Sequence, residues 1–279
     1  MGDFSTRPAH APLPPRAPRP TARHAGKGFV VTGAAGGIGA ATAALLVAEG
    51  ASVALADVRA DALDRAVAEI GRAEAFGVVL DAGDPGSIAC AIAQAQAQAG
   101  LGRLDGLVNC AAIVIHADPL ATAWGDWEKT FAVNLFGAYE AARLAASAMI
   151  ASGTRGAIVS VASEAGKKGH KESLAYSASK AALISMTRVL SAALAPHDIN
   201  VNCVCPGGVA TDMLREVAVA YGKLVESAPD AVFEKLVSSQ LLRHIEPAEI
   251  ARTISFLLSD EAMTIRGQAI NADGGDTPY

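Results

Sequence analysis

Tyr176 and Lys180 lie four positions apart in LAYSASKAAL, residues 174–183, where the residues between them are small. In a helix this spacing puts the phenol and the ammonium on one face, about one turn apart. A free tyrosine is a poor base near neutral pH because its pKa is about 10. A cation about 4 Å away favours the phenolate and lowers that pKa toward about 7. The spacing predicts a general acid–base group, with an exposed surface pair as the alternative.

Ser163 lies upstream of this pair, in IVSVASEAG. Together with the tyrosine and the lysine it could belong to a catalytic set. A serine that only forms a turn is the alternative. The serine, the tyrosine and the lysine together favour the chemical interpretation.

A second motif is the glycine-rich segment TGAAGGIG, residues 32–39, in which Gly33, Gly37 and Gly39 have the spacing G-x-x-x-G-x-G. Glycines allow a tight turn and a close approach of the backbone to a pyrophosphate, which rests on the amides of the next helix. A purely structural turn is the alternative. The sequence has no G-x-x-x-x-G-K followed by Ser or Thr, which excludes a P-loop.

Asp57 indicates which dinucleotide the turn would bind. It ends the second expected strand, 52–57, 18 residues after Gly39, where a carboxylate could accept hydrogen bonds from the ribose hydroxyls of the adenosine. The same carboxylate would repel a 2′-phosphate, and no Lys or Arg stands at positions 35, 36 or 58. Arg59 is close by, and we expect it to point to solvent. The sequence therefore favours NAD over NADP.

Elements that could position these residues recur along the chain as short apolar runs followed by helical patterns. Such alternation predicts an α/β, Rossmann-like doubly wound parallel sheet of about seven strands, with helices on both faces. We expect helices over 122–151 and 176–195, the second stopping at Pro196. The expected strands are 28–32, 52–57, 76–80, 104–109, 157–161 and 199–205, with a last strand in GQAINADGGD.

The composition, 51% hydrophobic and 18% charged over 279 residues, predicts one large core and a single catalytic domain over 26–279. Residues 1–25 differ, because they hold six prolines and four arginines, and we expect a disordered tail there. Residues 212–245 contain two helical patches and no strand pattern. An excursion at that end of a sheet predicts a substrate lid.

Several protein classes are disfavoured. The net charge of −5 argues against a nucleic-acid partner. Residues 28–48 carry no charge over a span long enough to cross a membrane, but their glycines favour strand, turn and helix. The cysteines predict free buried thiols and a reducing cytoplasm. The histidines show no metal-ligand spacing, so we predict no metal. The residues concerned are Cys90, Cys110, Cys203 and Cys205, and His10, His24, His116, His170, His197 and His244.

These motifs, in this order, resemble those of the short-chain dehydrogenase/reductase family over residues 26–279. Cys110 and Ala112 depart from the family's N-N-A-G motif. The matching segments are TGAAGGIG at 32–39, LDAGD at 80–84, NCAA at 109–112, AVNLFG at 132–137, Ser163 with Tyr176-x-x-x-Lys180, and PGGVATDM at 206–213.

The resemblance implies hydride transfer between a nicotinamide and a carbonyl or secondary alcohol carbon. It implies that Tyr176 exchanges the proton, Ser163 binds the reacting oxygen, Lys180 also holds the nicotinamide ribose and Asn134 positions a water. The alternative is that Asn134 only kinks a helix.

The resemblance further implies that Asp81 contacts the adenine and that Val209 and Thr211 hold the carboxamide. The NAD-binding residues it implies are Gly33, Gly37, Ile38, Gly39, Asp57, Asp81, Ala82, Asn109, Ala111, Tyr176, Lys180, Pro206, Gly207, Val209 and Thr211.

The sequence indicates the substrate less clearly than the reaction. Residues 163–187 resemble the polyol and sugar dehydrogenases of the family most, some of which act on sugar phosphates. A cation among Lys167, Lys168, His170 and Lys171 could face the substrate, or the loop could be solvated. The alternatives are a 3-oxoacyl or other carbonyl reductase, a hydroxysteroid-type dehydrogenase and a non-catalytic dinucleotide sensor. Relatives are commonly tetramers, so we expect a homotetramer or dimer.

Overall fold

The computed structural model describes residues 22–98 and 103–279. The strands in it are β1 (Gly28–Thr32), β2 (Ser52–Asp57), β3 (Ala75–Val79), β4 (Gly106–Asn109), β5 (Ala157–Val161), β6 (Asn200–Pro206) and β7 (Ala269–Ala272). They form one parallel sheet in the order β3-β2-β1-β4-β5-β6-β7. The expected fold class, an α/β Rossmann-like doubly wound sheet in a single domain, is therefore confirmed.

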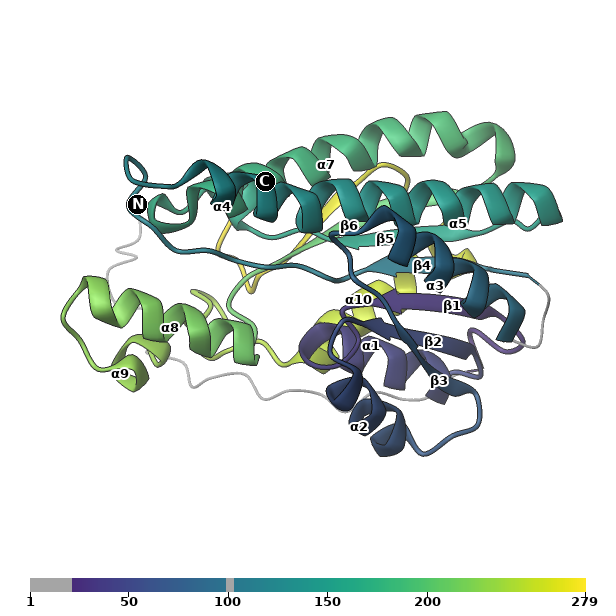
Figure 1. Ribbon diagram of the computed structural model, residues 1–279, viewed down its shortest axis with the longest axis horizontal. Coiled ribbons are helices and arrows are strands. Elements are labelled where there is room, and N and C mark those ends of the chain that lie inside the picture. The colour runs from purple at the N-terminus through teal and green to yellow at the C-terminus, as the bar shows by residue number, and fades with distance from the viewer. Residues whose placement is uncertain (1–21, 99–102) are drawn as a thin grey trace, which may run out of the picture.

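Helices cover both faces of the sheet. They are α1 (Gly37–Ala48), α2 (Ala60–Ile70), α3 (Pro85–Gln98), α4 (Trp124–Phe131), α5 (Ala138–Ser152), α6 (Ala165–Lys168), α7 (Leu174–Leu194), α8 (Asp212–Leu224), α9 (Pro229–Phe233) and α10 (Pro247–Leu257). One face packs against α1, α2 and α10, and the other against α3, α5 and α7 (Figure 1). Within the described ranges, no helix is both long and apolar enough to cross a membrane.

The central strands are apolar because both of their faces are covered. Every residue of β1, β5 and β6 is buried, as expected for a parallel sheet between two helical layers. The uncharged stretch 28–48 is β1, a glycine turn and α1, as the sequence predicted. Its helix buries Leu46 and Val47 against the sheet.

The strand order reverses between β1 and β4, because the chain builds β1 to β3 in one direction and β4 to β7 in the other. In open α/β sheets, ligands bind at the carboxyl ends of the strands on either side of such a reversal. The loops that leave β1, β4, β5 and β6 all start at this edge, and they carry most of the predicted site residues.

Two expectations about helices need refinement. The segment 122–151 is not one helix: a π-helical turn, Ala132–Gly137, separates α4 from α5. Helix α7 starts at Leu174, two residues before the predicted start, and a 3₁₀ turn containing Pro196 follows its end. The excursion 212–245 holds α8 and α9, with Pro229 at the start of α9, as the two helical patches indicated.

The predicted tail boundary is wrong at its end. Residues 22–25 belong to the folded chain, and His24 has no exposed surface. Its Nε2 lies 3.1 Å from the carbonyl oxygen of Ser255 in α10, and its ring meets Phe29 edge-on. The composition of residues 1–25 did not indicate this contact, and residues 1–21 lie outside the described ranges.

Candidate active site

The glycine turn after β1 is shaped by close backbone contacts. Gly33 has a φ of +67°, and a Cβ there would lie 2.7 Å from the amide nitrogen of Ala111. A Cβ on Gly39 would lie 2.2 Å from the carbonyl oxygen of Gly33. Gly36 precedes α1 without a side-chain cap, and the first turn of α1 holds no acidic residue. The amides of α1 therefore stay available to an anion such as a pyrophosphate.

Asp57 ends β2 beside this turn and is only 6% exposed. Its Oδ2 accepts a hydrogen bond from the amide of Ala35 at 3.1 Å, which fixes the carboxylate against the glycine segment. The sequence suggested that Arg59 points to solvent, but in the structure its side chain contacts Asp57. Its Nε donates to Asp57 Oδ1 at 3.2 Å, although 60% of the side chain is exposed. The predicted ribose-binding carboxylate thus has an arginine partner, which the sequence reasoning missed.

The segments after β3 and β4 form the next wall. Asp81 is exposed, and its Oδ1 accepts from the amide of Gly83 at 2.8 Å. Asn109 is buried and donates to the carbonyl oxygen of Ala138 at 2.9 Å, which ties β4 to α5. The amide of Ala111 donates to Thr32 Oγ1 at 3.1 Å. Asn109 and Ala111 therefore connect elements of the sheet, and Asp81 is the predicted residue of this wall whose side chain is exposed.

Two further predicted residues lie at the edges of these segments. Ile38, in the first turn of α1, is partly buried against the core. The carbonyl oxygen of Ala82 packs so tightly on Gly137 that a Cβ there would lie 1.9 Å away. Both residues hold elements of the predicted site in place.

The segment after β6 closes the other side. Pro206 is the last residue of β6, and its carbonyl oxygen accepts from the amide of Glu164 at 3.0 Å. Val209 is buried in a bridge to Ile245. Thr211 caps α8, accepting from the amide of Leu214 at 3.3 Å.

This segment also touches the glycine turn. A Cβ on Gly37 would lie 3.1 Å from Thr211 Cγ2. A Cβ on Gly207 would lie 2.9 Å from the carbonyl oxygen of Asp273. The structure therefore brings the glycine turn and the segment 206–211 together.

Ser163, Tyr176 and Lys180 meet at the carboxyl end of β5. The side chain of Ser163 lies close enough to the phenol of Tyr176 to lower its pKa. Lys180 is 2% exposed, and its Nζ donates to the carbonyl oxygen of Val161 at 2.7 Å. The same Nζ lies 5.6 Å from the centroid of the Tyr176 ring. Helix α7 places the two side chains on one face, as their four-residue spacing predicted.

The predicted direction of the Tyr176 pKa is wrong for the residues of this chain. Burial raises the pKa of Tyr176 to about 12, and the nearby side chain of Ser163 opposes that rise. Burial also lowers the pKa of Lys180 to about 8, so this ammonium gives up its proton more readily than a free lysine does. The sequence estimate assumed a charged lysine in a partly polar medium, and it did not include the desolvation of both groups.

Asn134 is buried within the π-helical turn. Its Nδ2 donates to the carbonyl oxygen of Ile113 at 2.9 Å, and its Oδ1 accepts from the amide of Ile113 at 2.9 Å. Nδ2 also lies 3.1 Å from Ser179 Oγ, on the helix of Tyr176. The side chain therefore fixes the loop after β4 to α7. This arrangement agrees with the kinked helix named as the alternative, and π-helical turns are frequent at functional sites.

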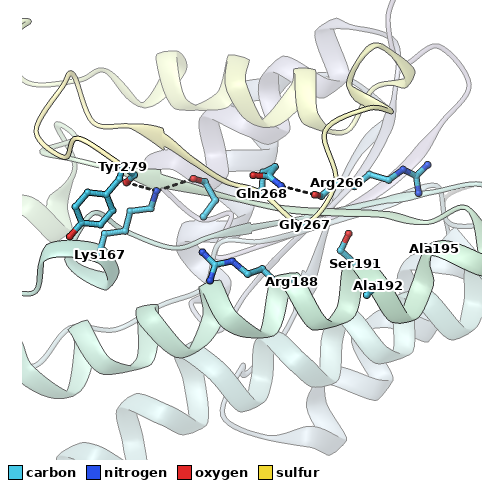
Figure 2. A pocket seen from close by; sticks show the side chains of 10 residues that line it. Lys167, Arg188, Ser191, Ala192, Ala195, Arg266, Gly267, Gln268 and Tyr279 are labelled. Carbon is cyan, nitrogen blue, oxygen red and sulfur yellow. Dashed lines mark hydrogen bonds between the residues drawn. The ribbon is translucent and has the colours of Figure 1, made fainter.

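The basic loop between Ser163 and Tyr176 is tied down by the protein itself. Lys167 donates to the carbonyl oxygens of Ala269 and Tyr279, at 3.0 and 2.9 Å, so it points to the sheet edge and the C-terminal segment (Figure 2). Lys168 and His170 both pair with Glu164.

A cavity of about 630 Å³ lies beside Lys167, between α7 and β7. Its lining includes Lys167, Arg188 and Arg266, so it lies apart from the predicted site residues (Figure 2). Among the described residues, no group of His, Cys, Asp or Glu could hold a metal ion.

Comparison with known proteins agrees with this geometry. The family model described as short chain dehydrogenase matches residues 27–221. The chain is 36% identical over 263 residues to 2,5-dichloro-2,5-cyclohexadiene-1,4-diol dehydrogenase of Sphingobium indicum, covering 90% of this chain and 97% of that one. It is 36% identical over 251 residues to galactitol 2-dehydrogenase (L-tagatose-forming) of Cereibacter sphaeroides, covering 89% and 94%. It is 35% identical over 254 residues to a 3-oxoacyl-(acyl-carrier-protein) reductase of Thermotoga maritima, covering 90% and 97%.

A parallel doubly wound sheet with a glycine turn at its reversal is typical of dinucleotide-binding proteins. The chain belongs to the short-chain dehydrogenase/reductase family. It is an oxidoreductase that acts on CH–OH groups or the corresponding ketones, in a family that uses nicotinamide cofactors.

Proposed function

We propose that the chain is an NAD(H)-dependent dehydrogenase that interconverts a secondary alcohol and a ketone in a polyol, sugar or sugar phosphate. The observation that carries this proposal is the meeting of Ser163, Tyr176 and Lys180 beside a glycine turn whose helix amides are free. Two of the relatives described above are named for a cyclohexadienediol and for galactitol, and both names denote alcohols with more than one hydroxyl.

The residues of the chain fit a dinucleotide. The glycine turn packs against the backbone of the loop after β4 too closely for a Cβ, and the uncapped start of α1 offers amides to a pyrophosphate. Asp57 is held in place to accept the ribose hydroxyls, which supports NAD. Lys180 and the segment Pro206, Gly207, Val209 and Thr211 would hold the nicotinamide half, and Asp81 would face the adenine.

The reaction has two parts, hydride transfer at the carbinol carbon and proton transfer at its oxygen. A bound oxidised nicotinamide would supply the acceptor for the hydride from the carbinol carbon and a positive charge at the site. Ser163 donates a hydrogen bond to the substrate oxygen, which stabilises its growing charge. Tyr176, as phenolate, takes the hydroxyl proton, so the alcohol loses one hydride and one proton and becomes a ketone. Lys180 orients the phenol, and Asn134 holds the loop that lines this side of the site.

A second function on the same site is the reduction of a 3-oxoacyl or other carbonyl compound with NADPH. Two observations favour it. The Thermotoga maritima reductase is nearly as similar as the polyol dehydrogenase. Arg59 stands beside Asp57, where a guanidinium could bind a 2′-phosphate.

A panel of substrates read at 340 nm with both cofactors tests the proposal. The panel consists of polyols, their phosphates, a hydroxysteroid and a β-ketoacyl thioester. We expect polyol oxidation with NAD, with a higher kcat/KM than with NADP. Turnover of only the steroid or the thioester, or with only NADPH, would contradict the proposal.

Tyr176→Phe is the variant that tests the mechanism. We expect kcat to fall by about 10²- to 10⁴-fold, because the phenol supplies the proton transfer. NADH binding, followed by the fluorescence of the dinucleotide, should stay close to that of the natural chain. A Tyr176→Phe variant that keeps its turnover would refute this role for the phenol.

Exposed apolar side chains support the proposed homo-oligomer. Phe136, Tyr139 and Ile150 lie on the π-turn and α5, and Val189 lies on α7, all with much of their surface open to solvent. Helices α5 and α7 cover the same face of the sheet (Figure 1). A second copy could cover exposed apolar side chains on this face of the molecule.

A further inference from the structure

The excursion 212–245, which the sequence predicts to be the substrate lid, has a small apolar core of its own. Its helices α8 and α9 share a cluster whose buried members are Ala218, Val232 and Phe233. In Figure 1 the two helices lie to one side of the sheet, outside the helical layers that cover its faces. Their position relative to the predicted site therefore depends on how the two ends of the excursion are held.

Both ends of the excursion meet the segment after β6. Thr211 caps α8 at the leading end. At the trailing end, the amide of Ile245 donates to the carbonyl oxygen of Gly208 at 2.9 Å. The carbonyl oxygen of Ile245 accepts from the amide of Ala210, also at 2.9 Å. The excursion thus leaves from and returns to the segment that we propose holds the nicotinamide.

The chain turns sharply after β7, and Asp273 folds this turn. Its Oδ1 accepts from the amide of Gly275 at 3.0 Å, and its Oδ2 accepts from the amide of Thr277 at 2.9 Å and from Thr277 Oγ1. Burial would raise the pKa of Asp273, but these hydrogen bonds outweigh burial and lower that pKa. Residues 273–277, the β7 turn, are therefore held in one shape by an ionised carboxylate.

The β7 turn binds the trailing end of the excursion. The amide of Ser239 donates to Asp276 Oδ1 at 2.7 Å, and Ser239 Oγ donates to the carbonyl oxygen of Gly275 at 3.2 Å. The amide of Gln240 donates to the carbonyl oxygen of Gly274 at 3.1 Å. Three hydrogen bonds therefore attach two consecutive residues of the excursion to this turn.

The two glycines of the β7 turn fit this contact. Both have a positive φ, +66° for Gly274 and +90° for Gly275. A Cβ on Gly274 would lie 2.5 Å from Ser238 Cβ, and a Cβ on Gly275 would lie 2.2 Å from Gln240 Cδ. The turn and the excursion therefore approach so closely that only glycine fits at both positions.

The same stretch of chain contacts two other parts of the predicted site. A Cβ on Gly207 would lie 2.9 Å from the carbonyl oxygen of Asp273. Lys167 of α6, a helix that begins two residues after Ser163, donates to the main-chain oxygen of Tyr279 at 2.9 Å (Figure 2). The β7 turn and the residues after it thus connect the excursion to the segment after β6 and to the loop of the predicted serine.

We propose that the β7 turn holds the lid in place and that Asp276 is a positioning residue, which acts on the substrate through the main chain of Ser239. Asp276 is not among the predicted site residues, so its effect must pass through the placement of the lid. This inference rests on the proposed function, because the lid serves a substrate bound beside the nicotinamide.

The proposal separates substrate binding from dinucleotide binding. Loss of the Asp276 contact weakens the attachment of the lid, while the contacts of Gly207 and Ile245 remain. A smaller population of the correctly placed lid lowers the apparent affinity for the substrate by the same fraction. One hydrogen bond of ordinary net strength corresponds to a factor of about 3 to 10 in such an equilibrium.

Hydrogen exchange of the full chain, followed by mass spectrometry, tests the attachment without any substrate. Asp276→Ala should speed exchange in a peptide that contains residues 238–241 by about 3- to 10-fold and leave peptides of β1 unchanged. Asp276→Asn keeps an acceptor for the amide of Ser239, so its exchange should stay close to that of the natural chain. The matched control is Asp64→Ala, at an exposed aspartate of α2, which should change neither peptide.

Steady-state kinetics then test the positioning role, with the substrate that the panel above shows to be turned over fastest. We expect Asp276→Ala to raise the KM for this substrate by about 3- to 10-fold and to leave kcat and the Kd of NADH within about twofold. Asp276→Asn should restore most of the lost affinity. Ser239→Ala removes the hydrogen bond to Gly275 from the other side of the contact, so it should raise KM as well.

Unchanged exchange in Asp276→Ala would overturn the inference. Equal losses of substrate and NADH affinity would indicate a general structural role and overturn it too, as would an Asp276→Asn variant as impaired as Asp276→Ala. These outcomes leave the dehydrogenase intact. A chain that turns over no secondary alcohol or ketone would overturn the proposed function, and the exchange experiment would still decide whether the β7 turn holds the excursion.

Discussion

At the scale of single residues, burial disfavours the charged forms of the side chains that form the site. Tyr176 is half-buried, Lys180 is almost completely buried, and Glu164 adds a negative charge nearby. Burial favours the neutral form of both the phenol and the amine, so their pKa values move apart, upward to about 12 for Tyr176 and downward to about 8 for Lys180. A positive charge close to the phenol, such as a bound oxidised nicotinamide would bring, would therefore favour proton transfer near neutral pH.

A spectroscopic titration tests this balance. In the protein without dinucleotide, the pKa of Tyr176 is raised to about 12, so its tyrosinate should be absent up to about pH 10. The difference in absorbance near 295 nm between the natural chain and Tyr176→Phe measures that one phenol. We expect no difference signal between pH 6 and 9, and a signal with a midpoint near 7 would contradict this picture.

The sequence indicated which residues form the site, but it did not indicate the direction in which burial shifts their pKa values. Tyr176, Lys180 and Ser163 meet as the spacing and the family resemblance indicated. The desolvation of Lys180 depends on the whole surrounding fold, including its bond to Val161, which no local spacing shows.

At the scale of elements, the site depends on where helices and loops touch backbone to backbone. The π-helical turn Ala132–Gly137 lets Asn134 reach the loop after β4 and brings Gly137 against Ala82. Strand positions followed from apolar runs because buried parallel strands have a simple composition. The π-turn left no such trace in the sequence, because its residues are compatible with an ordinary helix.

Gly137→Ala tests that contact. A Cβ would lie 1.9 Å from the carbonyl oxygen of Ala82, a backbone atom that can yield only if α5 or the loop after β3 shifts. We expect a loss of about 1–3 kcal/mol in the free energy of unfolding, measured by urea denaturation. Dinucleotide affinity should fall as well, because Ala82 follows Asp81.

Gly125→Ala is the matched control, because Gly125 is a helical glycine of α4 with no atom within 4 Å of a built Cβ. Alanine is the better helix former, so this variant should be neutral or more stable by up to about 1 kcal/mol. Equal effects of the two substitutions would show that the contact with Ala82 is unimportant.

At the scale of the whole molecule, the start of the described chain connects elements that are far apart in sequence. His24 lies between α1 and α10, near Ser255 and 3.6 Å from Glu49 Oε2. Arg23 reaches Glu49 and Glu261 in the same cluster. The sheet and its helices could be predicted from alternating patterns, but this closing contact could not, because the proline-rich composition before it points to a tail.

The cluster makes the stability of the fold depend on pH through His24. Burial, together with the nearby cations Lys27 and Arg23, lowers the pKa of His24 to about 4, although Ser255, Asp260 and the carboxylate of Glu49 favour the charged ring. The imidazole is therefore neutral in the folded chain and charged more easily in the unfolded chain, whose pKa is about 6.5. The stability due to neutral His24 is complete above about pH 6.5 and is lost as the pH falls through about 4.

A shift from about 6.5 to about 4 corresponds to roughly 3 kcal/mol between those limits. Urea unfolding of the natural chain at pH 7 and at pH 4.5 should therefore show a larger loss than the same pair of measurements on His24→Asn, because asparagine does not titrate. Carboxylates titrate in both proteins, so the comparison isolates the imidazole. His197→Asn, at an exposed histidine, should behave like the natural chain. If His24→Asn loses as much stability on acidification as the natural chain does, the buried imidazole is not the group that couples this fold to pH.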